Sequence, residues 1–386
     1  ICTAQALLAN MAGFYAAYHG AEGLKKIANR ILRYRQTLVT ALKWCGQEVY
    51  DCEGFDTIRV KVDKDFFDFF SEQFNATYID GWLTLSIDEL TTLSELNDIV
   101  RSLITFDSRT NTIEHVYKSE KNYEWFNIPQ RKKPWLQQEV FHKYRSETNM
   151  MRYIYELVSK DFSLVNGMMP LGSCTMKLNA AAELMPVSWP EFANMHPFAP
   201  KKEALGYQRI IDDLKEWLCD ITGFADINLQ PNAGSQGEYA GLLAIQEYHK
   251  SRGDDKRNIC LIPTSAHGTN PASAVMAGMK IVPVKCDEDG NIDIKDLTKQ
   301  AIMNTFELSA LMITYPSTHG VFETSIKEIC RIVHENGGQV YLDGANLNAQ
   351  VGLAKPGDYG ADVCHLNLHK TFCIPHGGGG PGVGPI

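Results

Sequence analysis

The sequence predicts an α/β protein in which a mostly parallel sheet follows a small α+β domain. From residue 141 onward, helical segments alternate with short apolar runs, which is typical of β-α units around a parallel sheet. Before residue 110, helical segments and β-type runs occur together with a hairpin signal. The composition, 44% hydrophobic and 22% charged, is that of a folded globular protein, and 386 residues suffice for two or three domains.

The first predicted elements are two helices over residues 3–18 and 21–43, with Gly20 breaking the helical pattern between them. A strand of alternating apolar and polar residues, a helix, a hairpin and a last helix follow. They are expected over residues 56–62 and 66–74, around Asp80-Gly81 and over residues 90–106.

The domain boundary is predicted within residues 107–138. This stretch is polar and contains Pro129 and Pro134, both of which disfavour continuous helix or strand. We therefore expect one domain over residues 1–110, a linker over 111–140 and a second domain over 141–386.

The second domain contains apolar runs predicted to be parallel strands, at residues 259–262, 281–284, 311–314 and 340–342. Ligands bind beyond the carboxyl ends of the strands in such sheets, so the residues after each strand are candidates for a site. The polar residues found there are His267, Thr318 and Asp343, and a further stretch ending at residue 368 is followed by His369, Lys370 and Thr371.

Charge and cysteine usage exclude several classes of protein. The 37 basic and 46 acidic residues give a formal charge of −9 without a basic stripe, which argues against nucleic-acid binding. No run of about 18 apolar residues occurs, so a membrane span is not expected. The ten cysteines form no CxxC pair and indicate a reducing compartment. The ends, Ile1 and Ile386, suggest an internal fragment of a longer protein.

A lysine, an aspartate and a Gly/Ser-rich turn at such strand ends are the parts of a pyridoxal phosphate site. The amine of Lys370 forms a Schiff base with the cofactor aldehyde if it is neutral. The carboxylate of Asp343 keeps the pyridine nitrogen protonated, so that the ring accepts electrons. Residues 232–238 lead into a helix and supply backbone N–H groups for the phosphate.

Each of these residues also has a common structural role. A lysine such as Lys370 is usually exposed, and an aspartate at a strand end usually caps a turn. His267 alone would be a loop histidine, and Cys174 a small buried apolar residue. A zinc site among Cys364, His365, His369, Cys373 and His376 is rejected, because the spacing fits no common zinc motif. The glycine run at 377–382 follows no strand, so it is not a dinucleotide-binding motif.

Four strings carry a family resemblance: LGSCTMKLN at residues 171–179, SAHGTNPAS at 265–273, YLDGAN at 341–346 and HLNLHKTF at 365–372. They resemble the P-proteins of the glycine cleavage system, and the resemblance covers essentially the whole chain. It implies two related halves, each with the fold type I architecture of pyridoxal phosphate-dependent transferases, of which the second binds the cofactor. Residues 1–110 would then end the first half, and 141–386 would be the large domain of the second half, truncated at its C-terminus.

The resemblance also implies residue roles. Lys370 would be the catalytic Schiff-base lysine and Asp343 the partner of the pyridine nitrogen, with Ala345 and His267 against the two faces of the ring. The phosphate would be bound by Gly234, Ser235 and Gln236, and further contacts to the phosphate or the ring hydroxyl would come from Thr318, His369 and Thr371. Ser173, Cys174 and Thr175 would line the substrate side, and no metal is expected.

The activity that the resemblance implies is decarboxylation of glycine. Carbon dioxide is released, and the aminomethyl group passes to the lipoyl disulfide of a partner H-protein. A homodimer or heterotetramer is expected, in the bacterial cytoplasm or the mitochondrial matrix. The alternatives are a truncated, non-catalytic scaffold and another fold type I enzyme, such as an amino-acid decarboxylase or a desulfurase. The presence of both Lys370 and Asp343 favours an enzyme over a scaffold.

Overall fold

The computed structural model describes residues 6–50, 54–104, 112–119, 131–160, 167, 181–372, 374 and 382–386. The chain divides into two compact units, one over residues 12–158 and the other over residues 1–11 together with 159–386. Each unit has its own hydrophobic core. Within the described residues, no helix is long and apolar enough to span a bilayer.

The unit over residues 12–158 is built from helices and a three-stranded antiparallel sheet of order β1-β3-β2. Gly20 has φ 59° and ψ −176° inside the first helical stretch, which confirms the predicted break. The elements are α1 (Ala6–Trp44), β1 (Thr57–Lys61), α2 (Lys64–Phe70), β2 (Thr77–Ile79), β3 (Trp82–Ser86), α3 (Leu93–Leu103), α4 (Thr112–Ser119), α5 (Val140–Lys143) and α6 (Glu147–Val158).

Two local features of this unit follow from sequence chemistry. The β2–β3 hairpin turns at Asp80 and Gly81, whose φ values of 52° and 82° match the turn type that Asp-Gly favours, so the predicted hairpin is confirmed. Helix α4 forms within residues whose polar composition predicts a linker. It is a helix because Ile113 and Val116, three residues apart, are both buried in the core of this unit.

The other unit is an α/β fold. Its elements are α7 (Ala181–Leu184), η2 (Met185–Ser188), α8 (Pro190–Ala193), α9 (Leu205–Thr222), α10 (Gly234–Ser251), β4 (Ile259–Pro263), α11 (Thr269–Met276), β5 (Lys280–Val284), α12 (Ile294–Met303), β6 (Leu308–Thr314), α13 (Ile326–Glu335), β7 (Gln339–Gly344), η3 (Leu347–Ala349), α14 (Pro356–Tyr359), β8 (Val363–Leu366) and α15 (Leu368–Thr371). The predicted strands are therefore present, and they pair in parallel in the order β5-β4-β6-β7-β8.

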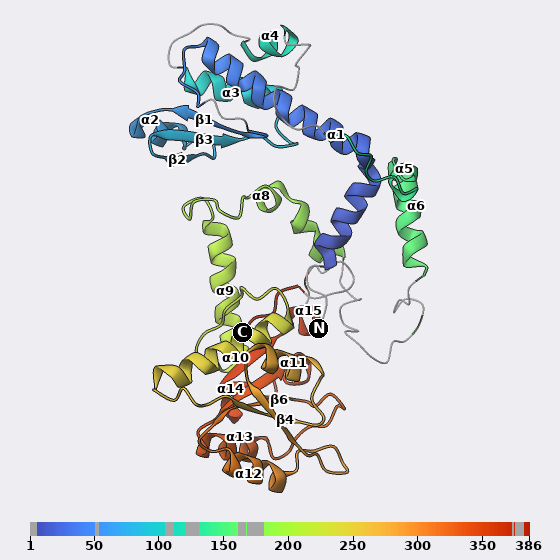
Figure 1. The fold of residues 1–386 in the computed structure, drawn as a ribbon, viewed down its shortest axis with the longest axis vertical. Helices are drawn as coiled ribbons and strands as arrows, with labels where there is room; N and C mark the ends of the chain where they lie inside the picture. The colour runs from blue at the N-terminus through green and yellow to red at the C-terminus, as the bar shows by residue number, and fades with distance from the viewer. Residues whose placement is uncertain are drawn as a thin grey trace. The chain divides into compact units, whose positions relative to one another are not determined.

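Helices cover both faces of this sheet (Figure 1). Residues of α12 and α13 pack with one set of strand side chains, and residues of α10 and α11 pack with the other set. The strands are continuous apolar runs because both of their faces are buried. This layering confirms the predicted α/β class and leaves the carboxyl ends of β6, β7 and β8 as the place where polar side chains are tolerated.

Candidate functional site

The site is built on one row of the sheet. Thr314 at the end of β6 pairs with Asp343 on β7, and Asp343 pairs with His365 on β8. Because paired residues on parallel strands project to the same face, these three side chains share a face with Tyr341, two residues before Asp343. Asp343 and His365 are 4% and 1% exposed. The register thus places a buried carboxylate beside a buried imidazole.

The Asp343 carboxylate has a structural contact as well as an electrostatic one. Its Oδ1 accepts a hydrogen bond of 3.0 Å from the backbone N–H of Ala345, which caps the turn after β7. The same oxygen lies 3.4 Å from Nε2 of His365. A buried carboxylate is costly unless it has such partners. The capping role and the functional role predicted for Asp343 are therefore compatible.

His365 is held from its other side by Tyr341. The Tyr341 hydroxyl and Nδ1 of His365 lie 2.7 Å apart, and both side chains are buried. Burial raises the pKa of Tyr341 well above its ordinary value, because the phenolate would lose its hydration, and the nearby Glu238 and Asp343 add to the rise. The Tyr341 hydroxyl therefore stays protonated at neutral pH.

Glycines let α10 approach this row closely. A Cβ on Gly234 would lie 2.5 Å from Oδ1 of Asn367, and one on Gly237 would lie 2.9 Å from Cβ of His365. The first N–H groups of a helix lack intrahelical acceptors, and the helix dipole favours an anion there. Two residues predicted to bind the phosphate, Gly234 and Ser235, begin this helix.

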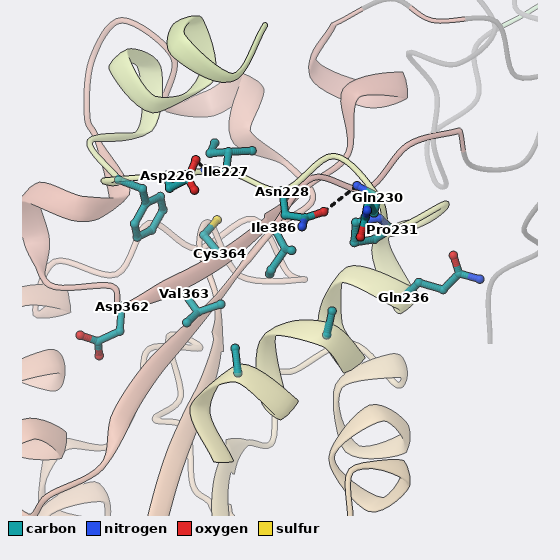
Figure 2. A pocket seen from close by; sticks show the side chains of 13 residues that line it. Asp226, Ile227, Asn228, Gln230, Pro231, Gln236, Asp362, Val363, Cys364 and Ile386 are labelled. Carbon is teal, nitrogen blue, oxygen red and sulfur yellow. Dashed lines mark hydrogen bonds between the residues drawn. The ribbon is translucent and has the colours of Figure 1, made fainter. Parts of the chain in front are cut away.

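Gln236, the third predicted phosphate ligand, lines a groove on another part of this unit. Its Oε1 accepts a hydrogen bond of 2.8 Å from the backbone N–H of Asn232. It also lines a groove of about 610 Å³ along β8, whose wall includes Asn228, Val363 and Ile386 (Figure 2). Among the described residues, Gln236 is the one predicted site residue in this groove. The groove is therefore separate from the row that contains Asp343.

Glu238 is a site residue that sequence reasoning missed. It is 3% exposed, and its two carboxylate oxygens accept hydrogen bonds from the hydroxyls of Thr269, at 2.8 Å, and Ser273, at 2.7 Å. Glu238, Asp343 and His365 each place one ligand-type atom within 4.8 Å of the others. The sequence did contain a signal for this residue. Glu238 is a charged residue on the same face of α10 as the glycines that pack against the sheet.

The Glu238 carboxyl has a raised pKa. Burial is the main cause, and the nearby Asp343 carboxylate also raises it, whereas His365 and the hydrogen bonds from Ser273 and Thr269 act in the opposite direction. Two carboxylates in one buried cluster cannot both be ionised without cost. The cluster thus favours a state with fewer negative charges than its two carboxylates could carry.

His267 is exposed and joins this cluster indirectly. Its Nδ1 lies 2.8 Å from the Thr269 hydroxyl, which in turn donates to Glu238. Thr318 lies exposed in the turn after β6, and no hydrogen bond among the described residues joins it to Asp343. The structure therefore connects His267 to the cluster and leaves Thr318 at its edge.

Helix α15 carries the predicted lysine. Lys370 is half-buried and makes no ion pair or side-chain hydrogen bond with the part of the chain that the structure describes, while its backbone N–H donates to Asn367 at 2.9 Å. His369 beside it is 4% exposed. Ala345, the predicted ring contact, is half-buried next to Asp343. An amine without a carboxylate partner is better placed to react as a nucleophile than one in an ion pair.

Several predicted or rejected positions fall outside the described residues. Ser173, Cys174 and Thr175 are among them, as are Cys373, His376 and residues 377–381. Cys364 lies in the core that α13 covers, whereas the next residue, His365, belongs to the opposite face. These two side chains therefore do not converge.

Buried polar atoms without partners gather around the same strand ends. Five such atoms, all in described residues, are Oγ1 of Thr314, Oδ1 of Asn367, Oγ1 of Thr371 and both amide atoms of Asn270. Buried polar atoms normally have hydrogen-bond partners, so this concentration indicates a ligand-binding region. Together with a helix N-terminus, a carboxylate beside an imidazole and a lysine without an ion pair among the described residues, these atoms fit an anionic aromatic cofactor with an electrophilic carbon.

Comparison with known proteins was made by family and by fold. The family model described as "Glycine cleavage system P-protein" matches residues 1–103 and 137–386. The chain is 59% identical over 398 aligned residues to the glycine dehydrogenase (decarboxylating) of Parasynechococcus marenigrum, covering all of this chain and 41% of that relative. It is 54% identical to glycine dehydrogenase (decarboxylating) 2 of Colwellia psychrerythraea, again covering 41% of it. The chain thus spans about two fifths of the length of these curated relatives.

A solved structure supports the fold. The chain resembles the crystal structure of a glycine decarboxylase (P-protein) in inhibitor-bound form, with a TM-score of 0.52 and 16% sequence identity. The alignment covers 76% of this chain and 61% of that one. The likeness confirms the predicted architecture.

Proposed function

The chain belongs to the glycine cleavage system P-protein family, and on this premise we propose that it acts in pyridoxal phosphate-dependent decarboxylation of glycine. Carbon dioxide is released, and the aminomethyl group passes to the lipoyl disulfide of an H-protein. The names of the relatives, glycine dehydrogenases (decarboxylating), support this activity. The observation that carries the proposal is the buried pair of Asp343 and His365 beside the first turn of α10.

Different residues of the chain would bind different parts of the cofactor. Pyridoxal phosphate, when bound, supplies a ring that accepts the electrons left behind when the substrate loses carbon dioxide. Asp343 would hold a proton on the ring nitrogen by its negative charge, and the first turn of α10, with Gly234 and Ser235, would bind the phosphate. Lys370 would bind the cofactor covalently through its amine. Burial of Asp343 and His365 keeps water away from this pair.

Other predicted contacts belong to the same proposal. We assign the faces of the ring to Ala345 and His267, and further contacts to His369, Thr371 and Thr318. We assign the substrate side of the site to Ser173, Cys174 and Thr175. Residues 141–386 would form the cofactor-binding large domain, and 1–110 the end of the preceding half.

The partners and location complete the proposal. The substrate is glycine, and the protein partner is a lipoylated H-protein; the assembly is a homodimer or heterotetramer. The relatives compared are bacterial, which supports a cytoplasmic location for a bacterial source. The unpaired buried polar atoms at the strand ends favour this enzyme over a scaffold, because a scaffold has no need of a ligand there.

The test is exchange of labelled bicarbonate into the carboxyl group of glycine. We expect the full-length protein to catalyse this exchange with pyridoxal phosphate and lipoylated H-protein, and Lys370→Ala to abolish it. Lys355→Ala is the matched control, since Lys355 pairs with Asp220 on the surface of the same unit. Decarboxylation of another amino acid at full rate without any lipoyl carrier would instead favour a different fold type I enzyme.

A further inference from the structure

We propose that Tyr341 and His365 are positioning residues. Their protons hold the Asp343 carboxylate in one orientation. The Tyr341 hydroxyl donates to Nδ1 of His365, and Nε2–H of His365 faces Oδ1 of Asp343. The second carboxylate oxygen, Oδ2, would then remain for the ring nitrogen of the cofactor. This inference rests on the proposed function for its ligand, and on the structure for the hydrogen bond between Tyr341 and His365 and the 3.4 Å contact between His365 and Asp343.

The direction of the first hydrogen bond follows from counting donors and acceptors. The Tyr341 hydroxyl is fully buried, and among the described residues its one hydrogen-bond partner is Nδ1 of His365, at 2.7 Å. If that nitrogen carried a proton, the hydroxyl proton would have no acceptor, and an unpaired buried donor is costly. Nδ1 is therefore the acceptor.

The direction of the second contact follows from the first. A neutral imidazole whose Nδ1 accepts carries its proton on Nε2. Nε2 lies 3.4 Å from Oδ1 of Asp343, so this proton faces the carboxylate. Oδ1 also accepts the backbone N–H of Ala345, and in the described part of the chain both contacts of the Asp343 carboxylate reach this oxygen.

The surroundings keep this chain of groups in place. Tyr341 and His365 lie under α10, where a Cβ on Gly241 would approach Cε2 of Tyr341 to 2.6 Å and one on Gly237 would approach His365. The other titratable group that faces His365 is Glu238, which is held by its own hydroxyl donors on α11. Both side chains are therefore packed against the glycine-bearing face of α10.

The arrangement has a functional consequence. Without the Tyr341 hydroxyl, Nδ1 of His365 loses its hydrogen-bond donor, and the imidazole is no longer held from that side. The Nε2–H is then free to turn away from Oδ1 of Asp343, and the carboxylate loses a contact that orients it toward a ring nitrogen. Tyr341 thus acts on the cofactor through two other residues and touches neither substrate nor cofactor.

The first test reads the imidazole directly. In full-length protein labelled with ¹⁵N-histidine and free of cofactor, we expect the ring nitrogens of His365 to show the tautomer protonated at Nε2. In Tyr341→Phe, which keeps the aromatic packing, we expect the same tautomer, because Nε2–H still faces the Asp343 carboxylate, but a displaced Nδ1 resonance, because Nδ1 has lost its hydrogen bond. Because no cofactor is needed, this measurement tests these contacts even if the proposed function fails. A wild-type tautomer protonated at Nδ1, or an unchanged Nδ1 resonance in Tyr341→Phe, would overturn the proposal.

The second test uses pyridoxal phosphate as the probe. Tyr341→Phe should weaken its binding about three- to tenfold, as expected for loss of one buried hydrogen bond. His365→Leu should weaken it by about tenfold or more, and His365→Gln, whose amide restores an N–H donor, should recover part of the loss. Unchanged affinity in both Tyr341→Phe and His365→Leu would refute the positioning role, whereas a wild-type protein that binds no pyridoxal phosphate would refute the proposed function.

The control is a second buried tyrosine of the same unit. The Tyr359 hydroxyl donates to Oε1 of Gln350 at 2.8 Å, and the Tyr359 ring packs in the core on the opposite sheet face. Tyr359→Phe therefore removes a comparable hydrogen bond without touching His365. It should leave both the Nδ1 resonance of His365 and the cofactor affinity unchanged, and an equal loss of affinity in Tyr359→Phe would show that Tyr341 acts only through stability.

Discussion

At the scale of single residues, the proposed chemistry of the site depends on the charge of Asp343. This side chain is buried and faces His365, so its replacement alters charge without opening a path to solvent. We expect Asp343→Asn to lower the glycine–bicarbonate exchange rate by roughly 10²-fold or more, because it removes the charge that keeps the ring nitrogen protonated. Exposed Asp220→Asn is the control, and full activity of Asp343→Asn would exclude the proposed role.

Single residues also show which parts of the candidate site could be predicted from the sequence. Lys370, Asp343 and the glycines at the start of α10 were predicted as site residues, because their types and their places after strands carry chemical information, and these assignments stay predictions. Glu238 and Tyr341 could not be predicted, because a buried glutamate and a strand tyrosine gain their roles from contacts with α11 and His365. Those contacts depend on sheet register and on which helix face packs down. His365 was considered for the rejected zinc site and begins the string at residues 365–372, but no role was predicted for it.

At the scale of elements, periodicity and turn chemistry predicted most of the fold. The five strands of the parallel sheet follow apolar runs, and the β2–β3 hairpin follows Asp80-Gly81. Helix α4 was not predicted, because its amphipathic pattern is short and lies in a polar segment. The burial of Ile113 and Val116, a tertiary effect, stabilises this helix.

The contact of α10 with the sheet gives a test at this scale. A Cβ on Gly241 would lie within 2.9 Å of atoms of Tyr341, Val363 and Ile386. Gly241→Ala should therefore lower the free energy of unfolding by about 1–3 kcal/mol, the usual cost of overpacking. In α9, nothing lies within 4 Å of a Cβ on Gly206, so Gly206→Ala should raise stability by up to about 1 kcal/mol. Urea unfolding measures both, and equal effects would contradict this packing.

The link between α13 and the sheet predicts a pH dependence. The hydrogen bond of 2.7 Å to Asp362 raises the pKa of His334 above its ordinary value of 6.5. A raised pKa in the folded state stabilises the fold below the unfolded pKa, and this stabilisation is lost as the pH rises through the folded pKa. The wild type should therefore exceed His334→Gln in stability at about pH 5.5 by more than at about pH 8.5. A stability difference between wild type and His334→Gln that grows with pH would contradict the raised pKa of His334. Exposed His319→Gln serves as the control.

At the scale of the whole molecule, the two compact units have separate cores. Units with separate cores unfold as separate cooperative transitions unless a large interface couples them. We expect two calorimetric transitions for this chain. Leu83→Ala, in the core of the unit over residues 12–158, should cost about 2–5 kcal/mol and lower one midpoint alone. Gly241→Ala should lower the other, and a shift of both midpoints by either variant would contradict separate unfolding.

The central claim, that the unit carrying β7, β8 and α15 binds pyridoxal phosphate through Lys370, has one direct measurement. Full-length protein with added pyridoxal phosphate is scanned for absorbance, reduced with borohydride and digested for peptide mapping. We expect a visible band that borohydride removes and a cofactor adduct on Lys370. Lys370→Ala should show neither, and Lys355→Ala should behave like the wild type. An adduct on another lysine, or a band that persists in Lys370→Ala, would contradict it.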